Sequence, residues 1–97
     1  MLVIGAWNFP IVLTLGPAIA AIAAGNTVVL KPSEVCPASS ALMAELVRRY
    51  LDNDAIAVVE GDGAVSQELI AQGFDHICFT GGTEIGRKVY EAPPPRT

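Results

Sequence analysis

The chain has 97 residues, of which 52% are hydrophobic and 16% are charged, and its formal net charge is −4. This length allows one small domain at most, and a charged fraction below the typical value of about 25% points to a slice of a larger apolar interior. The negative charge argues against nucleic acid as a partner, because nucleic-acid binding requires a basic face.

The first predicted elements are a strand at Leu2–Ala6 and a long apolar helix at Ile11–Ala24. Pro10 opens this helix and Gly25 closes it, which is the usual asymmetry of helix ends. Because the helix is apolar all round, we expect it to be buried on most of its faces, with a kink at Gly16–Pro17.

An apolar start of this kind can also belong to a signal peptide or a membrane span. A signal peptide needs a positively charged beginning, and neither Lys nor Arg occurs before Lys31. A span needs about 20 uninterrupted apolar residues, and the run is interrupted by Asn8, Pro10, Thr14 and Pro17. We therefore expect a cytoplasmic chain without membrane contact.

The rest of the chain continues the alternation of strand and helix. Gly73 is the expected left-handed cap of the third helix. Four strands separated by helices imply right-handed crossovers and a parallel sheet. The predicted fold class is α/β, a partial doubly wound (Rossmann-like) sheet of about four parallel strands, with at least one exposed edge. The remaining strands are predicted at Thr27–Leu30, Ile56–Val59 and Phe74–Phe79, and the remaining helices at Pro37–Leu51, Ala64–Gln72 and Thr83–Ala92.

The two cysteines, Cys36 and Cys78, do not have a metal-binding spacing, and no metal site is expected. We expect both to be reduced, small thiols that are buried or half-buried, Cys36 just before a helix and Cys78 inside a strand. His76 falls in the same predicted strand as Cys78, without a partner motif, and is expected to be structural.

Asn8 lies between the first strand and its helix, in the sequence Trp7–Pro10. Ligands of open α/β sheets bind at the carboxyl ends of the strands, so Asn8 is placed to face a ligand. Its amide can donate two hydrogen bonds without carrying charge, which suits a developing oxyanion. From the local sequence alone, a helix N-cap is the stronger interpretation of Asn8.

Lys31-Pro32-Ser33-Glu34 follows the second predicted strand. A carboxylate at this place can accept hydrogen bonds from both hydroxyls of a ribose, and a Lys can donate to the same sugar. The alternative is a surface salt bridge beside a turn, worth about 0–1 kcal/mol.

Gly61-Asp62-Gly63 begins like the dinucleotide fingerprint G-x-G-x-x-G, but Ser66 stands where the last Gly is required. The fingerprint is incomplete. We expect Gly61 and Gly63 either to have a minor backbone role near a nucleotide or simply to form a tight strand-to-helix turn.

The segment Thr80–Gly86 leads from the fourth strand through a Gly-Gly turn into the last helix. Free N–H groups at a helix start and the helix dipole attract phosphate. Gly81 and Gly82 allow the backbone to approach such a ligand closely. Gly86 is expected to allow close packing of the helix on the sheet.

Taken together and in this order, three motifs resemble the coenzyme-binding part of an aldehyde dehydrogenase: A-W-N-F-P at Ala6–Pro10, K-P-S-E at Lys31–Glu34, and F-T-G-G-T-E-I-G-R at Phe79–Arg87. The sequence F-D-H-I-C-F-T-G-G at Phe74–Gly82 is most similar to the class 3, fatty-aldehyde branch. The resemblance extends from about Leu2 to Ala92. It implies binding of NAD or NADP and oxidation of a small-molecule aldehyde to a carboxylic acid, in full-length enzymes that are homo-oligomers.

The resemblance also implies residue roles. It favours the oxyanion role of Asn8 over the cap, and it assigns the adenosine ribose to Lys31 and Glu34. Many members carry Ser at the position of Gly82, whose hydroxyl could contact the pyrophosphate, so coenzyme affinity or pose is expected to differ here. In the resembled mechanism a Cys thiolate attacks the aldehyde, hydride passes to the nicotinamide, and a Glu activates water. The implied coenzyme-binding residues are Trp7, Lys31, Glu34, Gly61, Gly63, Gly81, Gly82, Thr83, Glu84, Ile85 and Gly86.

The family's nucleophilic Cys and general-base Glu have no counterpart in this sequence. Residues 1–97 are therefore expected to be a fragment of an NAD(P)-binding domain, inactive alone, with the catalytic domain absent. The sequence becomes Pro93–Thr97 at its end, and the final Pro-Arg-Thr matches a one-base shift in assumed GC-rich codons for Ala-Pro-His-Leu-Thr, which suggests a frameshifted or split remnant. Two alternatives stay open: a non-catalytic module that folds against a complementary downstream fragment, and a stand-alone nucleotide-binding protein.

Overall fold

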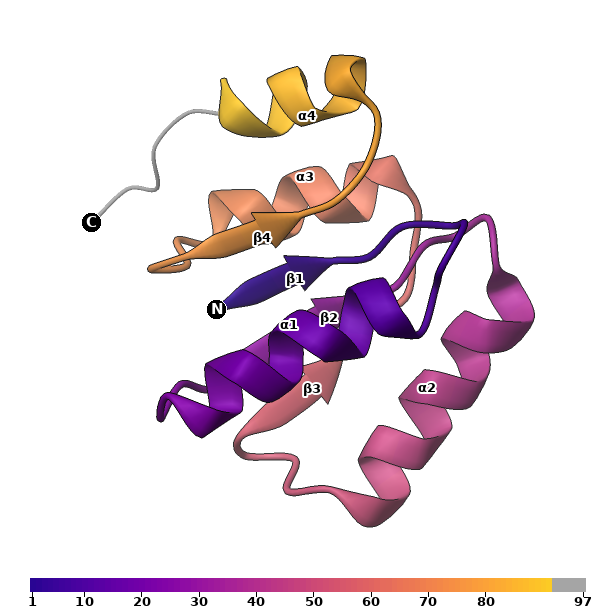
Figure 1. The fold of residues 1–97 in the computed structure, drawn as a ribbon, viewed down its shortest axis with the longest axis vertical. Helices are drawn as coiled ribbons and strands as arrows, with labels where there is room; N and C mark the ends of the chain where they lie inside the picture. The colour runs from indigo at the N-terminus through magenta and orange to yellow at the C-terminus, as the bar shows by residue number, and fades with distance from the viewer. Residues whose placement is uncertain (92–97) are drawn as a thin grey trace.

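A computed structural model describes residues 1–91, and within them four strands alternate with four helices (Figure 1). The last helix ends at Tyr90, while the predicted end at Ala92 and the unusual ending Pro93–Thr97 lie outside the described residues. The strands are β1 (Leu2–Ile4), β2 (Val28–Lys31), β3 (Ile56–Val58) and β4 (Ile77–Phe79), and the helices are α1 (Val12–Ala23), α2 (Pro37–Tyr50), α3 (Gly63–Ala71) and α4 (Thr83–Tyr90).

All strand pairs of the sheet are parallel, and the strand order is β3-β2-β1-β4. Val3 of β1 lies opposite Leu30 of β2 on one side and Cys78 of β4 on the other. The chain builds the sheet outward from β1 to β3 and then crosses over to add β4 beside β1. This reversal creates a topological switch point between β1 and β4, where open α/β sheets bind their ligands. The predicted parallel α/β fold is confirmed.

Two hydrophobic layers cover the two faces of the sheet. Because successive strand residues point to opposite faces, Val3 faces one layer while Leu2 and Ile4 face the other. The first layer joins β1–β3 to α1 and α2, and the second joins β1 and β4 to α3 and α4, elements whose arrangement can be followed in Figure 1. Buried members of the first layer are Val3, Ala18, Ala21, Val28, Leu30, Val47 and Ile56.

The prediction that α1 is buried on most faces is wrong. Its buried residues are Thr14, Ala18 and Ala21, which recur every three or four positions and therefore form one face. On the opposite face Val12 is 67% exposed and Ile19 is 69% exposed. Within residues 1–91 nothing covers this outer face, so apolar composition alone overstated the burial. The helix continues without a break through Pro17.

The predicted bounds of all four strands need correction, and β3 ends at Val58 instead of Val59. β1 ends at Ile4 instead of Ala6: Gly5 N makes one last ladder bond to the Lys31 carbonyl at 3.0 Å, and the chain bends from Trp7 onward. β2 excludes Thr27 and includes Lys31. β4 begins at Ile77, so the exposed His76 lies outside the strand, although its carbonyl accepts a hydrogen bond from Leu2 N at 2.9 Å.

The left-handed cap expected at Gly73 is present, since this residue follows α3 with φ of 90°. Both cysteines are free and half-buried, Cys36 immediately before α2 and Cys78 inside β4, as expected. No helix within residues 1–91 is long and apolar enough to cross a membrane. The same residues contain no group of three or more His, Cys, Asp or Glu side chains arranged to hold a metal ion.

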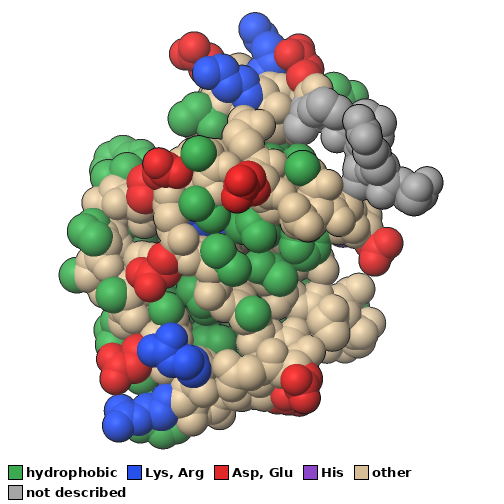
Figure 2. All heavy atoms as spheres, turned by 180° about the vertical axis from the view of Figure 1, so that it is seen from behind, with side chains coloured by type: hydrophobic (Ala, Val, Ile, Leu, Met, Phe, Trp, Pro, Cys, Tyr) green, Lys and Arg blue, Asp and Glu red, His purple; other side chains and the backbone are tan. Residues whose placement is uncertain are grey.

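Figure 2 shows the face opposite to the view of Figure 1. Hydrophobic side chains gather near its centre, and Lys and Arg side chains gather chiefly toward its upper and lower ends.

Candidate functional site

Three turns meet at one cleft of about 630 Å³ beyond the carboxyl ends of the sheet. They follow β1 at Gly5–Asn8, β2 at Lys31–Val35, and β4 at Thr80–Gly82. The cleft therefore lies at the switch point between β1 and β4, as the strand order requires. Its other wall comes from α3 and α4, through Gly63, Ala64, Ser66, Gln67, Ile70, Ile85, Lys88 and Val89.

Asn8 lies in the exposed turn after β1 and lines the cleft. Its side-chain oxygen Oδ1 accepts a hydrogen bond from the backbone N–H of Phe9 at 3.2 Å. The N-cap position of α1 is Ile11, which has no side-chain cap bond, so Asn8 does not cap this helix. The Asn8 Nδ2 donors have no acceptor within residues 1–91, which leaves them available to a ligand oxygen.

Lys31 is almost completely buried, with 1% of its surface exposed, although it carries an ammonium group. Its Nζ donates to the carbonyl oxygen of Pro32 at 2.7 Å and lies 3.5 Å from Oε2 of Glu34. A buried charge requires such partners, because desolvation otherwise costs much free energy. The pair is therefore not an ordinary surface salt bridge. Lys31 is buried beneath the turn, whereas Glu34 is half exposed and lines the cleft.

The turn that carries Glu34 is fixed by hydrogen bonds of its own. The Ser33 hydroxyl accepts from Val35 N at 3.3 Å, and the Ser33 carbonyl accepts from Cys36 N at 3.2 Å. Ser33 is itself buried. The turn therefore presents Glu34, whose Oε2 lies near Lys31, on a hydrogen-bonded backbone at the wall of the cleft.

The Gly81–Gly82 turn brings backbone against an aromatic ring. A Cβ at Gly81 would lie 2.6 Å from Cζ of Phe79, so a larger residue here requires the ring to move, whereas a Cβ at Gly82 would meet open space. Gly82 is the N-cap position of α4 and provides no side-chain cap. The first N–H groups of α4 therefore lack a side-chain partner and can meet an anionic group at the cleft.

The structure places the predicted site residues in two groups. Trp7, Asn8, Lys31, Glu34, Gly63, Gly81, Gly82 and Ile85 line the cleft together. Gly61, Thr83, Glu84 and Gly86 do not line it.

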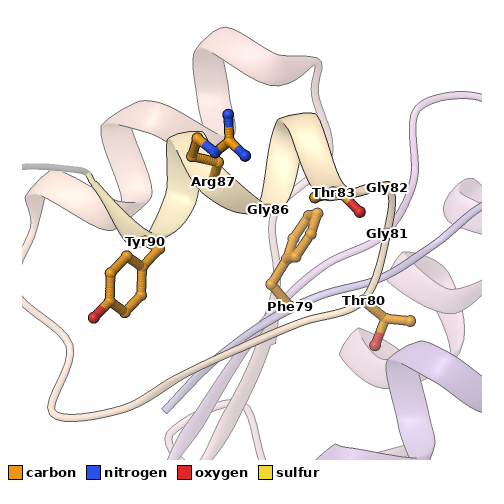
Figure 3. A pocket seen from close by; sticks show the side chains of 8 residues that line it. All are labelled: Phe79, Thr80, Gly81, Gly82, Thr83, Gly86, Arg87 and Tyr90. Atoms are coloured by element: carbon orange, nitrogen blue, oxygen red, sulfur yellow. The ribbon is translucent and has the colours of Figure 1, made fainter.

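Thr83 and Gly86 belong instead to a shallow, open depression on the outer side of β4 and α4, with Arg87 and Tyr90 (Figure 3). A Cβ at Gly86 would lie 3.2 Å from Cε1 of Phe79, so Gly86 does allow close packing of α4 on β4. Gly86 therefore supports the packing of α4 next to the cleft without lining the cleft itself.

Sequence reasoning missed the helical wall of the cleft. Gln67 and Ile70 of α3 and Lys88 and Val89 of α4 line it. Gln67 lies three residues after Ala64 and three before Ile70, and Lys88 and Val89 lie three and four residues after Ile85. This spacing puts them on one face of each helix. The signal was present in the sequence, but it becomes informative only once the sheet decides which helix face turns toward the cleft.

Comparison with known proteins places this geometry in a family. The family model described as "Aldehyde dehydrogenase family" matches residues 1–96. The chain is 49% identical over 92 residues to aldehyde dehydrogenase family 3 member A2 of Mus musculus, covering 95% of this chain and 19% of that protein. It is 50% identical over 90 residues to a coniferyl aldehyde dehydrogenase of a Pseudomonas species, covering 93% of this chain and 19% of that protein.

Among solved structures, the substrate-bound state of Staphylococcus aureus AldH matches with a TM-score of 0.91 and 41% sequence identity. That match covers 94% of this chain and 20% of the other chain. The present chain therefore spans roughly a fifth of the length of the relatives that it matches.

Proposed function

Because this chain belongs to the aldehyde dehydrogenase family, we propose that it supplies the coenzyme-binding part of an enzyme that oxidises an aldehyde to a carboxylic acid with NAD or NADP. The observation that carries this proposal is the convergence of three turns on one cleft, where Asn8, Glu34 and Gly81 meet. The cleft lies at the switch point where doubly wound folds bind dinucleotides.

The residues of the cleft fit an adenine dinucleotide. The half-exposed carboxylate of Glu34 can accept hydrogen bonds from both hydroxyls of a ribose, and the buried Lys31 holds it in place. Ala64 and Ile85, on facing helices, provide apolar surface suited to the flat adenine ring. The uncapped start of α4 at Gly82 suits a phosphate. When bound, the coenzyme accepts a hydride from the substrate.

Asn8 has a separate task at the β1 end of the cleft. With Oδ1 held by Phe9 N–H, its Nδ2 group is oriented to donate to the aldehyde oxygen as negative charge develops there. A neutral donor stabilises that charge without a proton transfer of its own. Neither cysteine lines the cleft, since the Cys36 thiol donates to the Trp7 carbonyl and Cys78 packs on the sheet core. We therefore assign the nucleophile and the general base to a part of the full-length enzyme outside this chain.

The test is calorimetric titration of the 97-residue chain with ADP-ribose, which carries the adenosine and both phosphates but no nicotinamide. We expect saturable binding that weakens at least tenfold in Glu34→Ala, about 1.4 kcal/mol. Glu45→Ala is the matched control, because Glu45 is an exposed carboxylate on α2 whose ion pair, with Arg49, is also on the surface. A folded wild-type chain that does not bind ADP-ribose would contradict the proposal.

A second candidate function is favoured by the outer face of α1, where Val12 and Ile19 are about two-thirds exposed. Contiguous exposed apolar surface is typical of a face that another polypeptide covers. The chain would then be a module that docks on a complementary fragment. Co-expression with the downstream segment of a relative tests this: a chain that is equally soluble alone and with that segment speaks against it.

A further inference from the structure

The first turn of α2 makes two hydrogen bonds to distant parts of the chain. The Cys36 thiol donates to the carbonyl oxygen of Trp7, and the Ser40 hydroxyl donates to Oε1 of Glu60, each at 3.1 Å. Within residues 1–91, every other hydrogen bond made by a side chain joins residues at most five positions apart. Two long-range contacts thus leave from a single helical turn.

These contacts reach the turns on both sides of the Glu34 turn. Trp7 immediately precedes Asn8, at the end of β1, and Glu60 immediately precedes the turn into α3, at the end of β3. Cys36 itself lies two residues after Glu34. The carboxyl-end turns of β1, β2 and β3 are therefore connected through one element.

The local sequence makes this turn rigid. Pro37 occupies the first helical position, where its fixed φ favours the helix start. Ser40 N donates to the Cys36 carbonyl at 2.9 Å, so the two linking residues belong to the same hydrogen-bonded turn. The Cys36 thiol is not used to cap its own helix and is directed to Trp7 instead.

We propose that the first turn of α2, called the bracket below, holds the Asn8 turn and the β3–α3 turn at fixed positions relative to Glu34. Cys36, Ser40 and Glu60 are its positioning residues. For coenzyme binding this inference rests on the proposed function. Ser40 is 5% exposed, and its hydroxyl loses its charged acceptor when Glu60 is removed. The thiol of Cys36 is a weaker hydrogen-bond donor than a hydroxyl. We therefore expect its loss to increase the mobility of the Trp7 turn while the free energy of unfolding changes little.

The Cys36 arm is tested without any ligand. Trp7 is the only tryptophan of the chain and is 63% exposed, so fluorescence excited where tyrosine does not absorb reports on its turn alone. We expect Cys36→Ala to raise the acrylamide quenching constant of Trp7 by about 1.5-fold and to lower its fluorescence anisotropy, because the turn gains motion. Cys36→Ser keeps a donor at this place and should behave like the wild type. Wild-type quenching and anisotropy in Cys36→Ala would overturn this arm.

The Glu60 arm is tested by calorimetry with ADP-ribose. We expect Glu60→Ala to raise the dissociation constant about 5–10-fold, as for the loss of one hydrogen bond to a charged group. Glu60→Gln retains an acceptor oxygen and should bind within about twofold of the wild type. Ser40→Ala should add little to Glu60→Ala, since both remove the same bond. Glu68→Ala, an exposed carboxylate of α3 whose side chain makes no such bond, is the matched control.

Urea denaturation of each variant separates positioning from unfolding, because binding is compared only where each variant is folded. Additive effects of Ser40→Ala and Glu60→Ala, or weak binding by Glu60→Gln, would overturn the bracket. If the folded wild type does not bind ADP-ribose, the proposed function fails, and the ligand-free fluorescence of Trp7 still decides whether the bracket exists.

Discussion

The ammonium nitrogen of Lys31 lies 3.5 Å from a carboxylate oxygen of Glu34, yet Lys31 is 1% exposed and Glu34 is 50% exposed. The two charged residues of this pair therefore have different roles, one in the stability of the fold and one at the ligand site. Lys31 also bonds the Pro32 carbonyl and belongs to the fold, whereas Glu34 belongs to the surface of the cleft.

We predict that Lys31→Met lowers the free energy of unfolding by about 1–3 kcal/mol, because the buried Pro32 carbonyl loses its donor. Urea denaturation followed by circular dichroism measures this loss. Lys88→Met is the control, since Lys88 is exposed and its removal should change stability by less than about 0.5 kcal/mol. Equal effects of the two substitutions would mean that Lys31 is not an anchor.

The neighbouring glycines of the β4–α4 turn should respond in opposite ways. Gly81→Ala forces the Phe79 ring to move, because the new Cβ would lie 2.6 Å from Cζ, and we expect ADP-ribose binding to weaken about tenfold. Gly82→Ser meets open space and adds a hydroxyl at the cleft, so binding should be unchanged or up to about tenfold tighter. Calorimetry decides, and weaker binding by Gly82→Ser than by Gly81→Ala would contradict the geometry.

Asp62 caps α3: its Oδ1 accepts from Ala64 N at 3.0 Å and from Val65 N at 3.3 Å. We predict that Asp62→Ala costs about 1 kcal/mol of stability, and that Asp62→Asn recovers most of it because the amide oxygen still accepts. Asp75→Ala serves as the comparison, since Asp75 is exposed and caps no helix. Chemical denaturation of the three variants tests the ranking, which fails if Asp62→Ala and Asp75→Ala are equally stable.

The outer face of α1 should govern self-association. We predict that the double variant Val12→Ser, Ile19→Ser reduces self-association of the chain at high concentration, because both side chains are about two-thirds exposed and apolar. Sedimentation velocity measures the change. Replacing the buried Ala18 and Ala21 by Ser is the opposite control, and it should destabilise the fold without improving solubility. Unchanged association in the double variant would show that another surface is responsible.

Much of the fold was predictable because parallel sheets leave a clear pattern. Short apolar runs ending in turn residues identified β2 and β3, and Pro37 and Gly73 marked helix ends that the structure confirms. The exposure of α1 was not predictable, since its sequence is equally apolar on both faces and only the neighbouring elements decide which face is covered.

The candidate site was predictable at its turns and not at its walls. Asn8, Glu34 and Gly81 follow strands, and the rule that ligands bind at carboxyl ends brings such residues together without knowledge of the strand order. The burial of Lys31 depends on packing between layers, and the spacing of Gln67 and Lys88 becomes informative only once that packing decides which helix face lines the cleft.

The strand order has a consequence for the time at which the cleft appears. Leu2 pairs with Ile77, so the central strand waits for a partner that is synthesised much later. Contacts between residues far apart in sequence form slowly, because a long loop must close first. A nascent chain can therefore assemble the β1–β3 half early, whereas the pocket for the ligand is completed only when β4 docks. Until then Leu2 and Ile4 lack part of their cover, and transiently exposed apolar surface of this kind favours aggregation.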